Sequence, residues 1–142
     1  MSRPLVVDTN IVLDLWVFAD DATRPLREAL LRSEFSWWAT SAMRDELARV
    51  LHYPRIAPRL AFYKLQPPHV LDHFDRHATL VEPPPRAPLR CSDPDDQKFI
   101  DLAVARQALL LSKDRAVLSM TKRLTAWSVQ AQPALPAFTP AP

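Results

Sequence analysis

The alternation of short apolar runs with helix-forming segments constrains the fold most strongly. Residues 5–7 read LVV, a β-branched run typical of a buried parallel strand. Further strands are predicted at residues 35–40, 79–83, 108–112 and 126–130. Helices are predicted between them, at residues 11–18, 25–32, 42–52, 58–66, 69–78 and 94–107. Because strands connected through helices pair in parallel, the sequence predicts an α/β fold with a central, mostly parallel sheet.

Polar residues mark where three of these helices begin. Asn10 is expected to cap the first helix and Ser41 the third. Asp93 stands before Pro94, and two more acids fill the following turn, which is the signature of a helix start. Asn10 is also placed where it can orient the side chain of Asp8 or a water molecule bound beside it.

The absence of glycine excludes several classes of enzyme. Neither a P-loop nor a G-x-G-x-x-G phosphate cradle can form without it, and the G-x-S-x-G elbow of hydrolases is also missing.

A length of 142 residues fits one domain, expected over residues 1–132, with a Pro- and Ala-rich tail at 133–142. The net charge of +2 is compatible with a nucleic-acid partner without requiring one.

The sequence predicts a cytoplasmic protein. Cys91 is the only cysteine and has no partner for an internal disulfide, which fits a reducing compartment. No apolar stretch approaches the roughly 20 residues of a membrane span, and no signal peptide is recognisable in MSRPLVVDTNIVLD.

The helical repeat separates acids that face the core from acids that face water. Asp96 heads the apolar stripe of the segment DPDDQKFIDLAVA, whereas Asp101 falls on the opposite face. Glu46 lies at the edge of the apolar stripe of AMRDELARVLH, whereas Asp45 points away. One acid of each helix is therefore expected near the sheet.

Two further acids follow apolar strands, Asp8 after PLVV and Asp114 after ALLLS. Ligands of open parallel sheets bind outside the carboxyl ends of the strands, and crossover helices begin at that same edge. We therefore expect Asp8, Glu46, Asp96 and Asp114 to converge there. Burying several like charges is unfavourable unless cations compensate them, and Mg²⁺ or Mn²⁺ prefers such oxygen ligands.

Three of these acids also have structural interpretations. Asp96 in a first helical turn is favourable for capping and for the helix dipole alone. Glu46 can be a solvated edge residue, and Asp114 can cap a turn. Asp8 has the weakest structural explanation, because an acid directly after a buried strand seldom serves structure only.

Three pieces of the sequence together resemble a known family: VVDTNIVLD, TSAMRDELARVL, and DPDDQKFIDLAVA followed by LLLSKDRAVL. They resemble the PIN domain, the ribonuclease fold of the toxins in bacterial toxin–antitoxin pairs. The resemblance implies a three-layer α/β/α sandwich with metal ligands at Asp8, Glu46, Asp96 and Asp114. The segment ARQALLLSKD departs from the family pattern, because it lacks glycine and is a residue shorter.

The resemblance also implies a reaction and partners. A pair of metal ions held by the acids would polarise a phosphodiester of RNA, activate water and stabilise the leaving oxygen, giving a 5′-phosphate and a 3′-hydroxyl. A small antitoxin and a homodimer are the implied protein partners. Four cations are candidates for contacting the RNA backbone, although each is equally explained as a solvated charge: Arg44, Arg49, Lys113 and Arg115.

Two other functions are compatible with the sequence. A PIN-like module that binds RNA or protein without cutting is favoured by the shortened segment before Asp114. A phosphatase with an aspartyl nucleophile is less favoured, because that chemistry normally needs a second Asp two residues after the first, where this chain has Asn10.

Three other patterns carry weaker expectations. Histidines recur at every fourth position: His69, His73 and His77. This spacing can hold zinc, but a solvated polar stripe is favoured because no further ligand is apparent.

Aromatic residues exceed what one small core requires and indicate an apolar interface: Trp37, Trp38, Phe62 and Tyr63. Asp14 is expected on the one wet face of the first helix.

Overall fold

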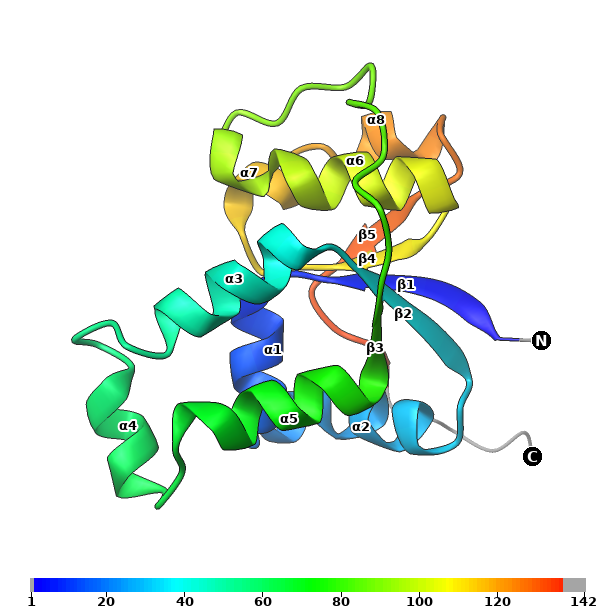
Figure 1. Cartoon of the computed structure of the whole chain (residues 1–142). Helices are drawn as coiled ribbons and strands as arrows, with labels where there is room; N and C mark the ends of the chain where they lie inside the picture. The colour runs from blue at the N-terminus through cyan, green and yellow to red at the C-terminus, as the bar shows by residue number, and fades with distance from the viewer. Residues whose placement is uncertain (1, 137–142) are drawn as a thin grey trace.

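The sheet is the centre of the molecule, and its five strands all run in parallel. In the computed structural model, which describes residues 2–136, the strand order is β3-β2-β1-β4-β5 (Figure 1). The strands are β1 (Arg3–Val7), β2 (Phe35–Ala39), β3 (Ala78–Leu80), β4 (Leu109–Leu111) and β5 (Gln130–Gln132). The predicted fold class and parallel sheet are therefore confirmed.

Helices cover both faces of the sheet and complete a three-layer α/β/α sandwich (Figure 1). The longer helices are α1 (Thr9–Trp16), α2 (Arg24–Leu31), α3 (Ser41–Val50), α4 (Ala57–Phe62), α5 (Pro67–His77) and α6 (Gln97–Arg106). Two shorter ones follow β4, namely α7 (Arg115–Leu118) and α8 (Thr121–Thr125). Helices α6 and α8 lie on one face and α1, α2 and α5 on the other, while α3 leads outward to α4. None of the helices within residues 2–136 has the length and apolar character needed to cross a bilayer.

The central strands are buried on both faces, as their apolar sequences require. Leu5 and Val6 in β1 and Leu110 in β4 expose none of their surface. Trp37 is also a core residue, at 2% exposure, and packs edge-to-face on Phe74. The interface predicted from aromatic content therefore does not include Trp37.

Two of the predicted helix caps are wrong, because the helices begin at earlier residues. Asp8 occupies the cap position of α1 and Thr40 that of α3, so Asn10 and Ser41 lie inside the first turns. The Asp8 N–H bonds the Leu111 carbonyl, so the strand ladder leads directly into the helix start. Asp93 does cap, because its side chain accepts from the Asp95 N–H at 3.0 Å, but it opens the 3₁₀ turn η2 (Pro94–Asp96) ahead of α6.

The C-terminal third differs most from the prediction. Helices α7 and α8 have at most five residues and so show no helical periodicity in the sequence. The strand predicted at 126–130 begins only at Gln130, because the chain first turns at Ser128, where φ is 61°. Of the tail predicted at 133–142, residues 137–142 lie outside the described residues.

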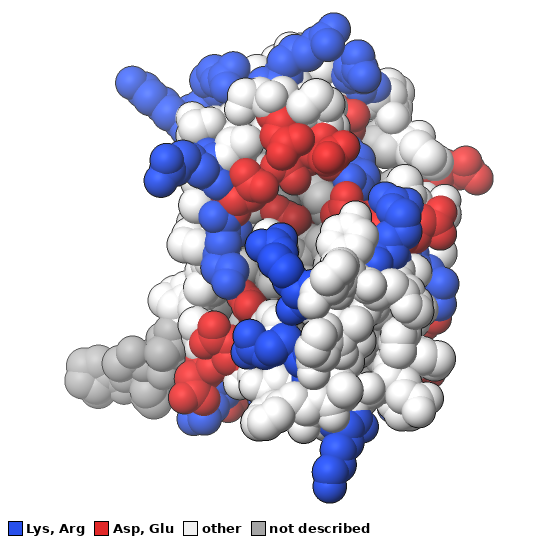
Figure 2. Space-filling view, turned by 90° about the vertical axis from the view of Figure 1, so that its left-hand side faces the viewer, with Lys and Arg blue, Asp and Glu red and all other residues white. Residues whose placement is uncertain are grey.

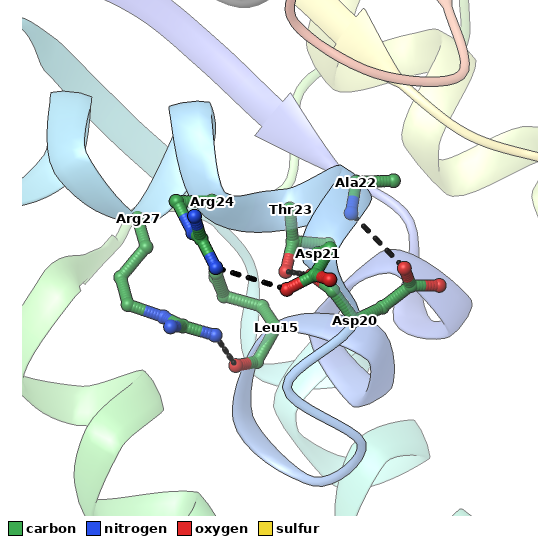
Figure 3. A network of polar contacts seen from close by, with 7 residues as sticks. All are labelled: Leu15, Asp20, Asp21, Ala22, Thr23, Arg24 and Arg27. Carbon is green, nitrogen blue, oxygen red and sulfur yellow. Dashed lines mark hydrogen bonds and ion pairs between the residues drawn. The ribbon is translucent and has the colours of Figure 1, made fainter.

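Polar contacts close the connection between α1 and α2 (Figure 3). The Asp20 carboxylate accepts from the Ala22 N–H at 3.0 Å, and the Thr23 hydroxyl donates to the Asp20 carbonyl at 2.6 Å. Arg27 of α2 donates to the carbonyl of Leu15 near the end of α1. These bonds satisfy backbone groups of the turn and tie the two helices together.

The histidines of α5 do not form the solvated stripe that was predicted. His73 and His77 stack on the Trp16 indole, with ring centroids 4.8 and 5.1 Å away. His69 instead accepts the Gln66 N–H at its Nδ1 and closes a capping box. Burial lowers the pKa of His77. The three rings therefore serve packing and capping.

A chain without glycine places other residues in left-handed backbone conformations. Among residues 2–136, five have positive φ: Ala19, Ser33, Lys64, Gln107 and Ser128. Gln107 ends α6 with φ and ψ both at 49°, and its side chain is exposed. Glycine is the usual residue at this position of a helix end, because it lacks the Cβ that crowds the backbone there.

We expect Gln107→Gly to raise the free energy of unfolding by about 0.5 to 1 kcal/mol, because the relieved Cβ crowding outweighs the added freedom of the unfolded chain. Urea unfolding of both proteins measures the difference. Gln107→Ala keeps the Cβ and is expected to give no such gain. An equal gain from alanine would attribute the effect to the side chain rather than to the backbone.

Candidate metal centre

The carboxyl ends of the two central strands bring the first two acids together. Asp8 follows β1 and Asp114 lies shortly after β4, and these strands are paired with Val7 opposite Leu111. The strand order reverses between β1 and β4, since β2 and β3 extend to one side and β5 to the other. This is the switch point where open parallel sheets bind ligands.

Asp96 is distant from Asp8 in the sequence but lies at the same edge of the sheet. The 3₁₀ turn η2 carries it, and the residue is 7% exposed. Gln97 fixes this turn, because its side chain accepts the Cys91 N–H at 2.7 Å and donates to the Leu89 carbonyl at 2.8 Å. Asp96 is thereby held beneath the start of α6 and against the sheet, as its position in the apolar stripe predicted.

Three carboxylates form one compact cluster. One oxygen from each of Asp8, Asp96 and Asp114 lies within 4.8 Å of the other two. Asp8 is 4% exposed, and its Oδ2 accepts from the Ser112 hydroxyl at 2.6 Å. Asp114 accepts from the Ala116 N–H at 2.9 Å, so it also caps α7. We call these three acids the carboxylate cluster.

Ser112 is a residue of the centre that the sequence did not single out. It is fully buried, and its Oγ both donates to Asp8 and accepts from the Asp114 N–H at 3.0 Å. One hydroxyl therefore fixes both acids at the switch point. The available signal was a polar residue closing the otherwise apolar run ALLLS.

Burial and mutual repulsion raise the pKa of two of the acids. Desolvation raises the pKa of Asp8 most, and the charges of Glu46 and Asp114 raise it further, against the Ser112 hydrogen bond. Desolvation also raises the pKa of Asp96, to about 8, with added contributions from Asp114 and Asp8. The metal-free cluster is therefore short of positive charge.

Glu46 lies beside the cluster but has partners of its own. Its Oε2 pairs with the Lys98 ammonium at 2.5 Å, and its Oε1 accepts from the Thr9 hydroxyl. Sequence patterns had not identified Lys98 or Thr9. Thus three of the four acids expected to converge form the cluster, and the fourth is tied to a lysine.

The cluster and Glu46 line one open cleft of about 270 Å³. Its wall consists of Asp8, Thr9, Asn10, Glu46, Arg49, Val50, Tyr53, Asp95, Asp96, Lys98 and Asp114. Figure 2 shows acidic atoms gathered on this side of the molecule, with lysines and arginines around them. Ser41, which the sequence predicted as a helix cap, lines a different depression together with Leu80 and Arg106.

The four predicted phosphate contacts divide into two groups. Arg44 donates to both carboxylate oxygens of Asp75 at 2.7 Å, and Lys113 forms an ion pair with Asp14. Arg49 and Arg115 are exposed, and Arg49 lines the cleft. Only the second group is free of an ion pair within residues 2–136.

Two acids are placed differently from the prediction. Asp14 is 8% exposed and pairs with Lys113, so it does not lie on a wet face of α1. Asp101 is half-buried and accepts from the Ala87 N–H and the Gln97 amide, both at 2.8 Å. The proline-rich loop packs over this side of α6, a contact that helical periodicity does not reveal.

The residues present fit a divalent cation. Among the described residues only two buried side-chain polar atoms lack a partner, Trp16 Nε1 and Asp96 Oδ2. The second belongs to the cluster, where a cation would supply both the missing contact and the missing charge. Three hard oxygen donors match the preference of Mg²⁺ and Mn²⁺.

Comparison with known proteins agrees with this geometry. The family model of the PIN domain matches residues 4–116, which include the cluster acids and Glu46. Curated proteins provide no match to the sequence. The family match covers well over half of the chain and runs from β1 beyond β4. With its parallel sheet and acids at the switch point, the chain belongs to the PIN domain family.

Proposed function

We propose that the protein is a metal-dependent endoribonuclease whose cation is held by Asp8, Asp96 and Asp114. A PIN domain indicates nuclease chemistry in general. The unpartnered Asp96 Oδ2 inside a group of three carboxylates is the observation that carries the metal dependence. Mg²⁺ and Mn²⁺ are the proposed ions, since both prefer carboxylate oxygens.

The chain's own residues would prepare the centre for this chemistry. The Ser112 hydroxyl holds Asp8, and the Ala116 N–H holds Asp114, so both carboxylates are fixed by the fold. A divalent ion, when bound, polarises a phosphodiester and acidifies water, which fits hydrolysis to a 5′-phosphate and a 3′-hydroxyl. Arg49 at the rim of the cleft would attract the RNA backbone.

A cleavage assay tests this proposal. The protein is expected to cut a labelled RNA in the presence of Mg²⁺ or Mn²⁺, to stop when EDTA is added, and to resume when the metal is restored. A module that binds RNA or protein without cutting gives no products with any metal. Cleavage that continues in EDTA contradicts the proposed centre.

A basic and aromatic surface beside the cleft supports a single-stranded substrate. We call residues 49–64 the basic arm; it comprises the end of α3, α4 and the turns around them. The arm contains Arg49, Arg55, Arg59 and Lys64 and no acid. Three of its aromatic side chains are exposed, Tyr53 by 45%, Phe62 by 78% and Tyr63 by 40%. Cations interleaved with aromatic faces suit the phosphates and unstacked bases of a single strand.

The arm continues into the cleft. Arg49 and Tyr53 line the same wall as the carboxylate cluster, while α4 carries the arm outward. Within the described part of the chain, none of the arm's cations takes part in an ion pair, although Arg59 lies 4.7 Å over the Phe18 ring. A strand with one phosphate at the cluster would therefore reach free positive charge along the arm.

Phe62→Ala is expected to weaken binding of a labelled single-stranded RNA by about fivefold or more, because stacking one base contributes about 1 to 3 kcal/mol. Arg55→Ala is expected to reduce the slope of log K against log salt by about 0.7, the value for one lost phosphate contact. Fluorescence anisotropy in EDTA measures both without cleavage.

Leu31→Ala is the matched control, because Leu31 is 69% exposed on α2, outside the arm. It should leave affinity unchanged. Unaltered RNA affinity in both arm variants would remove the arm from the substrate path, and would favour a protein-binding role for its exposed aromatics.

We also propose a cytoplasmic toxin of a toxin–antitoxin pair, working as a homodimer and blocked by a small antitoxin. The support is the resemblance to such toxins and a centre equipped for RNA cleavage. Induced expression is then expected to arrest bacterial growth, whereas a variant without cleavage activity should not. Light scattering measures the oligomeric state, and a monomer at micromolar concentration would contradict the dimer.

A further inference from the structure

We infer that Lys98 takes the place of a second metal ion in this centre. Paired with Glu46, it leaves the protein with one divalent-cation site, at the carboxylate cluster. The inference rests on the proposed metal-dependent function and assigns Lys98 as a positioning residue that keeps Glu46 from ligating metal.

Both carboxylate oxygens of Glu46 already have a partner, and one of these partners is the Lys98 cation. The ammonium lies 2.5 Å from Glu46 Oε2 and donates to the Asp95 carbonyl at 2.5 Å. The Thr9 hydroxyl donates to the other oxygen, Glu46 Oε1. The two charged side chains are only 25% and 19% exposed, so water screens this pair less than a surface pair.

The cleft thus has one part that lacks a cation and one part that already has one. Asp96 Oδ2 has no partner, and its neighbours in the cluster are carboxylates. Glu46 lines the same cleft but is not among the acids whose oxygens gather within 4.8 Å, as far as residues 2–136 are concerned. Within the described residues the carboxylate cluster has no cation to balance its negative charge, whereas Lys98 already balances the charge of Glu46.

A metal ion at Glu46 would have to displace the ammonium or lie beside it. A divalent ion beside the ammonium would be repelled by it twice as strongly as a monovalent ion at the same distance. Displacing Lys98 would also break its bond to the Asp95 carbonyl. Both routes disfavour a second ion while Lys98 is present.

Counting bound Mn²⁺ by electron paramagnetic resonance tests the inference without measuring activity. The wild type is expected to bind one Mn²⁺ per chain. Lys98→Met keeps the length of the side chain and removes its charge, so Glu46 becomes available and a second Mn²⁺ should bind. The first ion should bind at least as tightly as before, since a like charge has left the cleft. Adding Glu46→Gln to Lys98→Met should return the count to one.

Arg49→Met is the matched control, because it removes a cation of the same cleft that forms no ion pair with Glu46, whose ion-pair partner is Lys98. It should still bind one ion. Lys98→Gln is a second neutral variant, and circular dichroism shows which variants are folded. Two ions on the wild type overturn the inference, and so does a single ion on the folded neutral variants. A wild type that binds no Mn²⁺ overturns the proposed metal-dependent function as well, which separates the two failures.

Discussion

Asp8→Asn is expected to lower the rate of RNA cleavage by more than about 100-fold, since loss of groups that merely support metal ligands already costs 10- to 100-fold. The substitution preserves shape, and the amide oxygen can still accept the Ser112 hydroxyl that now bonds Asp8. It removes the charge of a carboxylate that is 4% exposed and lies within 4.8 Å of an oxygen of both Asp96 and Asp114. Affinity for Mn²⁺ should fall together with the cleavage rate.

Stability distinguishes this effect from damage to the fold. Burial, and then the charges of Glu46 and Asp114, raise the pKa of Asp8 and disfavour its ionised form, so Asp8→Asn should leave the metal-free protein as stable or make it more stable. Asp14→Asn is the matched control, since Asp14 is a buried acid in α1, the helix that follows Asp8, and its partner is Lys113. It should retain cleavage. Full cleavage by Asp8→Asn, or equal loss in both variants, would contradict the assigned centre.

The stability of the metal-free protein is expected to fall as pH rises from about 4 to about 8, by at most about 1.4 kcal/mol per pH unit for one carboxyl. The sign follows from Asp96, whose pKa in the folded protein is about 8 against a model value of 3.8. Between these values the folded state binds more protons than the unfolded state, so raising the pH removes stability. Urea unfolding in EDTA at several pH values measures the slope.

Divalent metal should reverse this trend. Mn²⁺ competes with protons for the same oxygens, so its stabilisation should grow with pH. At a hundredfold its Kd, a bound ion adds about 2.7 kcal/mol, or about 5 to 10 °C in Tm for a chain of this size. Asp96→Asn should flatten the metal-free slope and lose most of the metal effect. A slope that persists in that variant would place the titrating group elsewhere.

The order of local patterns along the chain was sufficient to predict the architecture. LVV and ALLL are short apolar runs typical of strands buried on both faces, and the helices between the strands indicate that these pair in parallel. The same argument placed Asp8 and Asp114 at one edge of the sheet, and the 3.6-residue repeat turned Asp96 towards it. These predictions needed only the spacing of apolar and polar residues within each strand or helix, which is local information.

The partners of the charged side chains were decided by the tertiary structure. Helical periodicity gives the direction of Glu46 but not that Lys98, from a distant segment, lies opposite it. Likewise, Asp14 was predicted to be exposed, because the sequence does not show that Lys113, which follows β4, lies next to it. A repeat fixes an angle about one helix axis, whereas a contact depends on how two elements pack. The sequence therefore determined the sheet and the edge where its acids gather, and packing alone decided which acids remain for a metal.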